Sequence, residues 1–182
     1  MSAKYSVLKY GSASLRRRSV RVERVDAGIR QLARDMLETM YASNGVGLAA
    51  EQVGREEAIC VMDTRQPRGE YEEGPPENPD VPMPLVLINP RIVASSGTQV
   101  GQEGCLSFPD IYVQIKRAAE VTVAFTDLEG RERELHGMGL LARAIQHELD
   151  HLNAVLLVDR MSAVQKVSVA GKLKRLKKES QG

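Results

Sequence analysis

Two histidines separated by four positions give this chain its most specific chemical signal. They belong to the run His147-Glu148-Leu149-Asp150-His151, which has the pattern HExxH. Residues four apart in a helix project from the same side, so two imidazoles at this spacing can bind one metal ion. The intervening glutamate lies close enough to exchange a proton with a water molecule. Taken alone, the motif indicates a metal-dependent hydrolase and is typical of zinc proteases.

A catalytic metal site also needs a third protein ligand and an open position. No histidine follows His151, and Glu179 lies in a basic tail, which leaves Asp159 as the remaining downstream alternative. Upstream, Cys105 follows Gly104 in a polar segment where glycine would let the chain turn tightly around a metal. We therefore predict that Cys105, as a thiolate, is the third ligand.

Composition excludes several classes of protein. The 42% hydrophobic and 27% charged residues are ordinary for a soluble globular chain, and a net charge of +1 gives no overall preference for nucleic acid. No apolar run approaches the roughly 18 residues of a membrane span, and no apolar segment starts the chain, so we expect a cytoplasmic protein. Two cysteines are too few for a disulfide framework, and Cys60, in an apolar run, is expected to be buried. His136 has no metal-spaced partner and is expected to be an ordinary sheet or surface residue.

Apolar periodicity predicts three helices. The first covers about 26–43, with Asp26 as N-cap and Asn44-Gly45 as its stop; the second covers about 139–153 and carries HExxH; the last starts after Ser162. The expected strands are 5–9, 58–63, 85–89, 91–95, 112–117, 121–127 and 132–135. A long solvated loop is expected at 65–84.

The order of these elements lacks regular βαβ alternation. It predicts an α+β fold with mainly antiparallel sheets packed around a central HExxH helix, together with an N-terminal and a C-terminal helix.

Three motifs together resemble those of bacterial peptide deformylases. They are Gly45-Val46-Gly47-Leu48-Ala49-Ala50-Glu51-Gln52, Glu103-Gly104-Cys105-Leu106-Ser107 and Gln146-His147-Glu148-Leu149-Asp150-His151-Leu152, in the order of the family. The resemblance covers essentially the whole chain. It implies one deformylase-like domain over 1–182, with a basic C-terminal helix at about 162–180. That family removes the formyl group from the N-terminal formyl-methionine of nascent polypeptides and releases formate.

The resemblance also implies catalytic roles. A metal-bound hydroxide would attack the formyl carbon, with Glu148 as general base and then acid. Gln52 and the backbone N–H of Leu106 would stabilise the oxyanion. Fe²⁺ is the native metal in many members, and Zn²⁺, Ni²⁺ or Co²⁺ also occur. The implied metal ligands are Cys105, His147 and His151.

The resemblance also implies which residues contact the substrate. The backbone at Val46 and Gly47 would pair with an extended substrate, and Gly104 would do so from the other side. Either these residues form the core, or they are walls of the methionine pocket: Val46, Leu140, the aliphatic stem of Arg143, Ala144 and His147. Two departures from some relatives, the longer loop 65–84 and Tyr112 in place of Arg, would alter access or downstream preference.

Glu103 and Asp150, next to the predicted metal ligands, each have two possible roles. Glu103 would pair with Arg117 and fix the cysteine segment, or the two would be independent surface charges. Asp150 would orient a ligand histidine or face solvent.

The basic tail 171–178 has two readings. It is either a solvated helix end or a contact with ribosomal RNA near the exit tunnel. We expect a monomer without membrane contact. Two further hypotheses are a zinc endopeptidase, which would need a downstream ligand, and a non-catalytic metal- or ribosome-binding protein.

Overall fold

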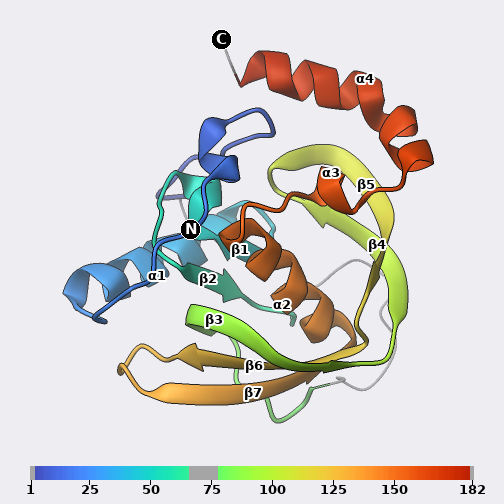
Figure 1. The fold of residues 1–182 in the computed structure, drawn as a ribbon. Coiled ribbons are helices and arrows are strands. Elements are labelled where there is room, and N and C mark those ends of the chain that lie inside the picture. Colours follow the sequence, from blue (N-terminus) through green and yellow to red (C-terminus); the bar gives the residue numbers. More distant parts are fainter. Residues whose placement is uncertain (1–2, 66–77, 181–182) are drawn as a thin grey trace.

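The computed structural model describes residues 3–65 and 78–180 (Figure 1). Most of the loop expected at 65–84 therefore lies outside the described residues. The elements in chain order are η1 (Ala13–Arg16), α1 (Ala27–Ala42), β1 (Gly47–Ala49), η2 (Ala50–Val53), β2 (Ile59–Met62), β3 (Leu85–Ser96), β4 (Gln99–Cys105), β5 (Phe108–Arg117), β6 (Glu120–Thr126), β7 (Glu132–Met138), α2 (Gly139–Leu152), α3 (Leu157–Arg160) and α4 (Ala163–Glu179).

The strands form two antiparallel sheets. One has the order β1-β2-β3-β6-β7, and the other is the β4-β5 pair. Helix α2 lies at the centre of the molecule, against the larger sheet, whereas α4 lies at the periphery beside the C-terminus (Figure 1). The prediction of an α+β fold with antiparallel sheets around the HExxH helix is confirmed.

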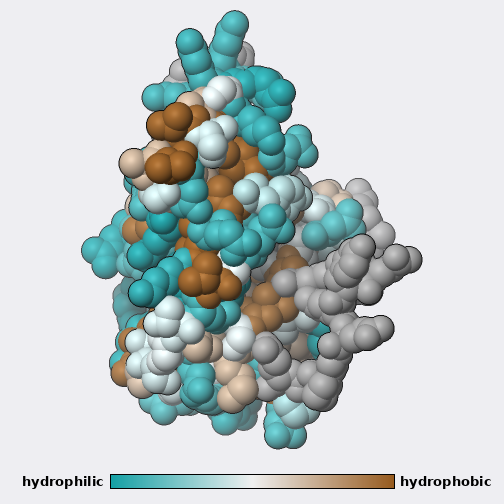
Figure 2. Space-filling model, turned by 90° about the vertical axis from the view of Figure 1, so that its right-hand side faces the viewer, coloured by the Kyte–Doolittle hydropathy of each residue, from teal (hydrophilic) through white to brown (hydrophobic). Residues whose placement is uncertain are grey.

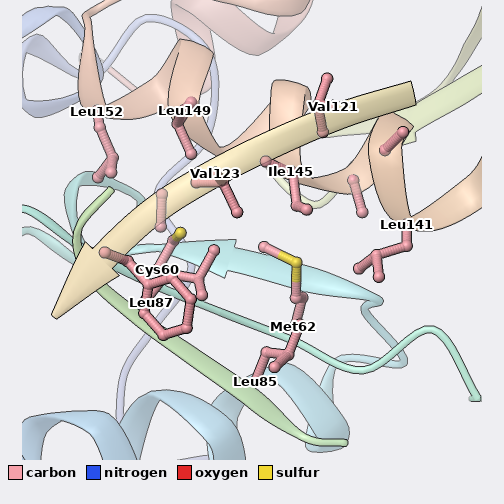
Figure 3. Packing of buried hydrophobic residues seen from close by; sticks show 14 residues of the cluster. Cys60, Met62, Leu85, Leu87, Val121, Val123, Leu141, Ile145, Leu149 and Leu152 are labelled. Carbon is pink, nitrogen blue, oxygen red and sulfur yellow. The ribbon is translucent and has the colours of Figure 1, made fainter. Parts of the chain in front are cut away.

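Strand β2 shows why α2 has this position. All four of its residues are buried, and successive side chains of a strand point to opposite faces. Cys60 and Met62 pack with α2, while Ile59 and Val61 pack in a separate cluster with α1. Figure 3 shows Cys60 and Met62 beneath the α2 side chains Leu149 and Ile145. The sheet is therefore covered by one helix on each face at this end, and the predicted burial of Cys60 is confirmed.

The three predicted helices are present with closely matching ends. The Asp26 side chain accepts a hydrogen bond from the Ile29 N–H at 2.9 Å, and Asn44 has φ 53° just beyond α1. Ser162 caps α4 by accepting from Gln165 N. None of the described helices has both the length and the apolar content to cross a membrane. On the face shown in Figure 2, hydrophobic side chains gather in small groups separated by hydrophilic ones.

The strand expected at 5–9 is wrong. Leu8 N in this segment donates to Gln52 O in η2 at 2.7 Å, and Tyr10 N just beyond it donates to Ser107 O between β4 and β5 at 2.9 Å. Two donors reaching two different segments do not make a ladder.

The break expected at Pro90 is also wrong, because β3 runs from Leu85 to Ser96. The proline, which has no N–H, falls in a register shift between Ile88 and Arg91. Asn89 next to it has φ 51° and exchanges two 2.8 Å hydrogen bonds with the Val22 backbone.

Strand β4 was not expected at all. Its residues read as a polar, glycine-containing turn, yet they pair with β5 from Gln99↔Arg117 to Cys105↔Phe108. The turn expected at Gly104 is accordingly wrong, since this glycine lies inside the strand. A Cβ on Gly104 would lie 2.7 Å from Tyr112 Cε1, so a larger residue here would displace the tyrosine ring from its present position.

Candidate metal centre and active site

Three donor side chains converge where the end of β4 meets α2. One ligand atom from each of Cys105, His147 and His151 lies within 4.8 Å of the others, and this is the one such group of His, Cys, Asp or Glu among the described residues. Cys105 Sγ lies 3.3 Å from His151 Nε2. The two imidazole centroids are 5.1 Å apart, with an interplanar angle of 66°. Both imidazoles therefore lie beside one thiol, as a shared ion would require.

The donor set fits a divalent transition metal. Imidazole nitrogen and thiolate sulfur suit Zn²⁺, Fe²⁺, Co²⁺ and Ni²⁺, and three protein donors leave a position for a reactant. His147 uses Nδ1 for a 3.0 Å hydrogen bond with Glu103 Oε2, which leaves its Nε2 for a ligand.

Asp159, the alternative third metal ligand, is engaged elsewhere. Asp159 accepts from the backbone N–H of Leu156 and pairs with Arg16. His136 lies exposed on β7, beside Thr122 and Glu120, as predicted.

Glu148 is buried directly beside the triad. It is 4% exposed, and its Oε2 has no hydrogen-bond partner among the described residues. Burial raises the pKa of this carboxyl to about 7, against the opposing effect of His147. A Cβ at Gly47 would lie 2.2 Å from Glu148 Oε1. The glycine in β1 thus makes room for the carboxylate.

Gln52 is held with its amide nitrogen toward the triad. Its Oε1 accepts from the Ala49 N–H at 2.9 Å. Its Nε2 donates to Ser107 Oγ at 3.1 Å and reaches Cys105 Sγ at 3.5 Å. The amide orientation is therefore fixed from both ends, and Ser107 is a contact to which the sequence assigned no role.

Glu103 joins β4, β5 and α2 through buried hydrogen bonds. Arg117 donates Nε to Oε1 at 2.8 Å and Nη2 to Oε2 at 2.9 Å, so the expected ion pair is present. Arg143 Nη1 donates to Oε1 at 2.7 Å. Burial alone would raise the pKa of Glu103, but the hydrogen bonds from Arg117 and His147 hold it well below its usual range.

Two further side chains complete this network. Arg143 also donates to the Ile115 carbonyl at 3.0 Å. The residue is buried, and its side chain lines the cleft. Asp150 accepts from Arg117 Nη1 at 2.6 Å and from Arg160 Nε at 2.9 Å. Asp150 therefore contacts two arginines, and orients the ligand histidine only through Arg117 and Glu103.

A cleft of about 480 Å³ opens onto the triad. Tyr112, 65% exposed, lies at its edge against Gly104. The structure brings together every residue that the sequence proposed for substrate contact. They are Val46, Gly47, Gly104, Leu140, Arg143, Ala144 and His147, and Leu106, predicted for the oxyanion, lines the same cleft.

Comparison with known proteins agrees with this geometry. Residues 4–167 match the family model for polypeptide deformylase. The peptide deformylase of Endomicrobium trichonymphae is 40% identical over 176 residues, covering 97% of each chain. That of Thermomicrobium roseum is 46% identical over 156 residues, covering 86% of this chain and 85% of the relative.

Solved structures show the same relationship. The peptide deformylase of Synechococcus elongatus in complex with actinonin has a TM-score of 0.82 at 40% identity, with coverage of 94% of this chain and 89% of that one. A plant peptide deformylase has a TM-score of 0.86 at 31% identity, with coverage of 98% and 92%.

An antiparallel α+β fold with this donor triad defines a metal-dependent amide hydrolase. Within that class, the chain belongs to the polypeptide deformylase family. Enzymes of this family are metalloenzymes that remove the formyl group from the N-terminus of nascent peptides.

Glu51, next to Gln52, is a buried acid outside the triad. It is 0% exposed, and neither carboxylate oxygen has a hydrogen-bond partner among the described residues. Burial raises its pKa from 4.5 to about 8, and the charge of Glu148 adds to the effect. The folded protein therefore holds a proton here that the unfolded chain releases above about pH 4.5.

Replacing Gly47 with Ala should lower turnover by roughly 100-fold, because the new Cβ displaces the Glu148 carboxylate. The assay is steady-state release of formate from a formyl-methionyl peptide. Gly171→Ala is the matched control, since a Cβ there meets nothing within 4 Å. Full activity of Gly47→Ala would show that the position of Glu148 does not depend on this glycine.

Glu51→Gln should stabilise the protein increasingly as pH rises. A raised folded-state pKa means that the wild type loses stability between about pH 4.5 and pH 8, and glutamine removes that loss. We expect the Tm difference to be small at pH 5 and to exceed about 5 °C at pH 8, measured by calorimetry. Exposed Glu56→Gln is the control for removing one charge. A difference independent of pH would contradict a buried protonated Glu51.

Proposed function

We propose that Cys105, His147 and His151 hold one divalent metal ion and that Glu148 moves the proton in hydrolysis of the formyl amide. The convergence of one thiol and two imidazoles beside a buried, unpartnered carboxylate carries this proposal. A bound metal ion would lower the pKa of a water molecule and polarise the formyl carbonyl. The thiolate donor supports Fe²⁺ as the native metal, with Zn²⁺, Ni²⁺ or Co²⁺ accepted on preparation.

Glu148 would accept the proton of the attacking water at Oε2, the oxygen without a partner. It would then return this proton to the nitrogen of the leaving amine. The close packing of Gly47 supports this role, because it limits where the carboxylate can lie.

Gln52 and Leu106 would bind the negative oxygen of the tetrahedral intermediate. The Ala49 N–H fixes the Gln52 amide with its nitrogen toward the triad. Lys9 Nζ donates to the Leu106 carbonyl at 2.8 Å, which holds the adjoining peptide segment in place. Donors that are already oriented stabilise such an oxyanion without reorganisation.

The cleft would hold the peptide in an extended conformation. The backbone at Val46 and Gly47 would pair along one side, and Gly104 would pair along the other. Leu140, Ala144 and the stem of Arg143 would enclose the methionine side chain. Glu103 and Arg117 would position His147 through the 3.0 Å hydrogen bond at Nδ1.

The remaining inferences concern the domain organisation, oligomeric state and location of the protein and its contact with the ribosome. We infer that residues 1–182 form one domain that acts as a cytoplasmic monomer on nascent formyl-methionyl chains. Helix α4 has exposed lysines along its last turns, which supports a contact with ribosomal RNA near the exit tunnel.

Glu148→Ala should reduce formate release from formyl-Met-Ala-Ser by about 10³-fold, because the proton acceptor is lost. Wild type should cleave neither acetyl-Met-Ala-Ser nor casein, which separates deformylation from endopeptidase activity. Turnover near wild type in the variant would contradict the role of Glu148, and casein digestion by wild type would contradict the substrate class.

Cys105→Ala should remove most of the bound metal, because the two imidazoles lose the third donor. The measurement is elemental analysis of protein purified without oxygen. Cys60→Ala is the matched control, since that thiol is buried in the core and should leave the metal in place. Equal metal content in all three proteins would exclude Cys105 as a ligand.

A further inference from the structure

A second concave surface of about 780 Å³ lies against α2. We name it the basic groove, and its charged lining residues are Arg18, Arg91, Lys116, Arg117, Arg160 and Asp150. Helix α2 contributes Gln146 and Asp150, and its C-cap residue Asn153 lies on the same side. Arg143, Ala144, His147 and Glu148 of this helix line the catalytic cleft instead. The same helix therefore separates two cavities.

The charges of the groove are not balanced. Asp150 is the one acid among its described lining residues, against five bases. It is already paired with Arg117 and Arg160, and Arg117 is paired with Glu103 as well.

Three cations remain without an acidic partner among the described residues. The Arg91 and Lys116 side chains make no hydrogen bond or ion pair there, and Arg18 donates only to Asn153 Oδ1 at 3.3 Å. All three are exposed, and they come from separate segments of the chain. A protein with net charge +1 thus collects about three uncompensated positive charges in one hollow.

This arrangement suits one kind of ligand. Guanidinium groups present planar donors that match phosphate oxygens, and like charges that repel in the free protein are neutralised when a polyanion binds. A single carboxylate would neutralise only one of the three cations, whereas consecutive phosphates carry a charge for each. The volume also exceeds what one small anion fills.

We propose that the basic groove binds consecutive phosphate groups, either as a free oligophosphate or in the backbone of single-stranded RNA. Arg18, Arg91 and Lys116 would contact the phosphates at the rim. Binding there requires neither the metal triad nor the catalytic cleft.

The test is calorimetric titration at physiological ionic strength, with inorganic tripolyphosphate and with a short RNA that lacks terminal phosphates as separate probes. Arg91→Gln/Lys116→Gln should weaken binding of at least one probe by roughly tenfold or more, because two charge-assisted contacts are lost. Arg24→Gln/Arg34→Gln, just before and within α1, removes the same charge from exposed residues outside the groove and should bind like wild type. All three proteins should retain formate release and Tm.

The titrations distinguish the two possible sources of the phosphate groups. Groove-dependent binding of tripolyphosphate alone supports a free oligophosphate ligand, and groove-dependent binding of the RNA supports a phosphodiester backbone. No binding of either probe overturns the proposal. So does binding that is unchanged by the groove variant, or that is lost only in the Arg24→Gln/Arg34→Gln control.

Discussion

The buried carboxylate of Glu103 is the interaction on which the geometry of the site depends. It accepts hydrogen bonds from Arg117 and Arg143 and shares one with His147, so β4, β5 and α2 meet at a single group. Without this carboxylate, the buried guanidinium of Arg143 would have no acidic partner among the described residues, and Arg117 would keep only Asp150. Proteins tolerate an unpaired buried charge poorly. The position of Cys105 relative to the two histidines follows, because the cysteine is only two residues from Glu103 along β4.

The layers of the fold supply the second constraint. β2 is buried on both faces, so α1 and α2 must cover opposite sides of the sheet. Leu141, Ile145 and Leu149 hold α2 against that sheet, and the histidines consequently face away from this core toward the β4-β5 pair. Metal binding and core packing thus use different sides of one helix.

The sequence predicted what local signals determine. Asp26 and Ser162 mark helix starts by their own side-chain bonds, and the spacing of His147 and His151 needs only helical geometry. Strand β4 escaped prediction because its stability comes from β5, and its glycines and polar residues resemble a turn locally. The bonds of Asp150 to Arg117 and Arg160 join separate segments of chain, so no local pattern reveals them.

The five residues of the HExxH segment have four different surroundings. His147 and His151 face the thiol, Glu148 faces Gly47, and Leu149 enters the core, while Asp150 meets arginines on the outer side. One residue more or less in this helix would turn everything beyond it by about 100°. A substitution in this helix affects one of these contacts at a time. A change in the length of α2 would displace the core residues, the metal ligands and the outer ion pairs simultaneously. Insertions and deletions among relatives should therefore accumulate in the connecting loops, not in this helix.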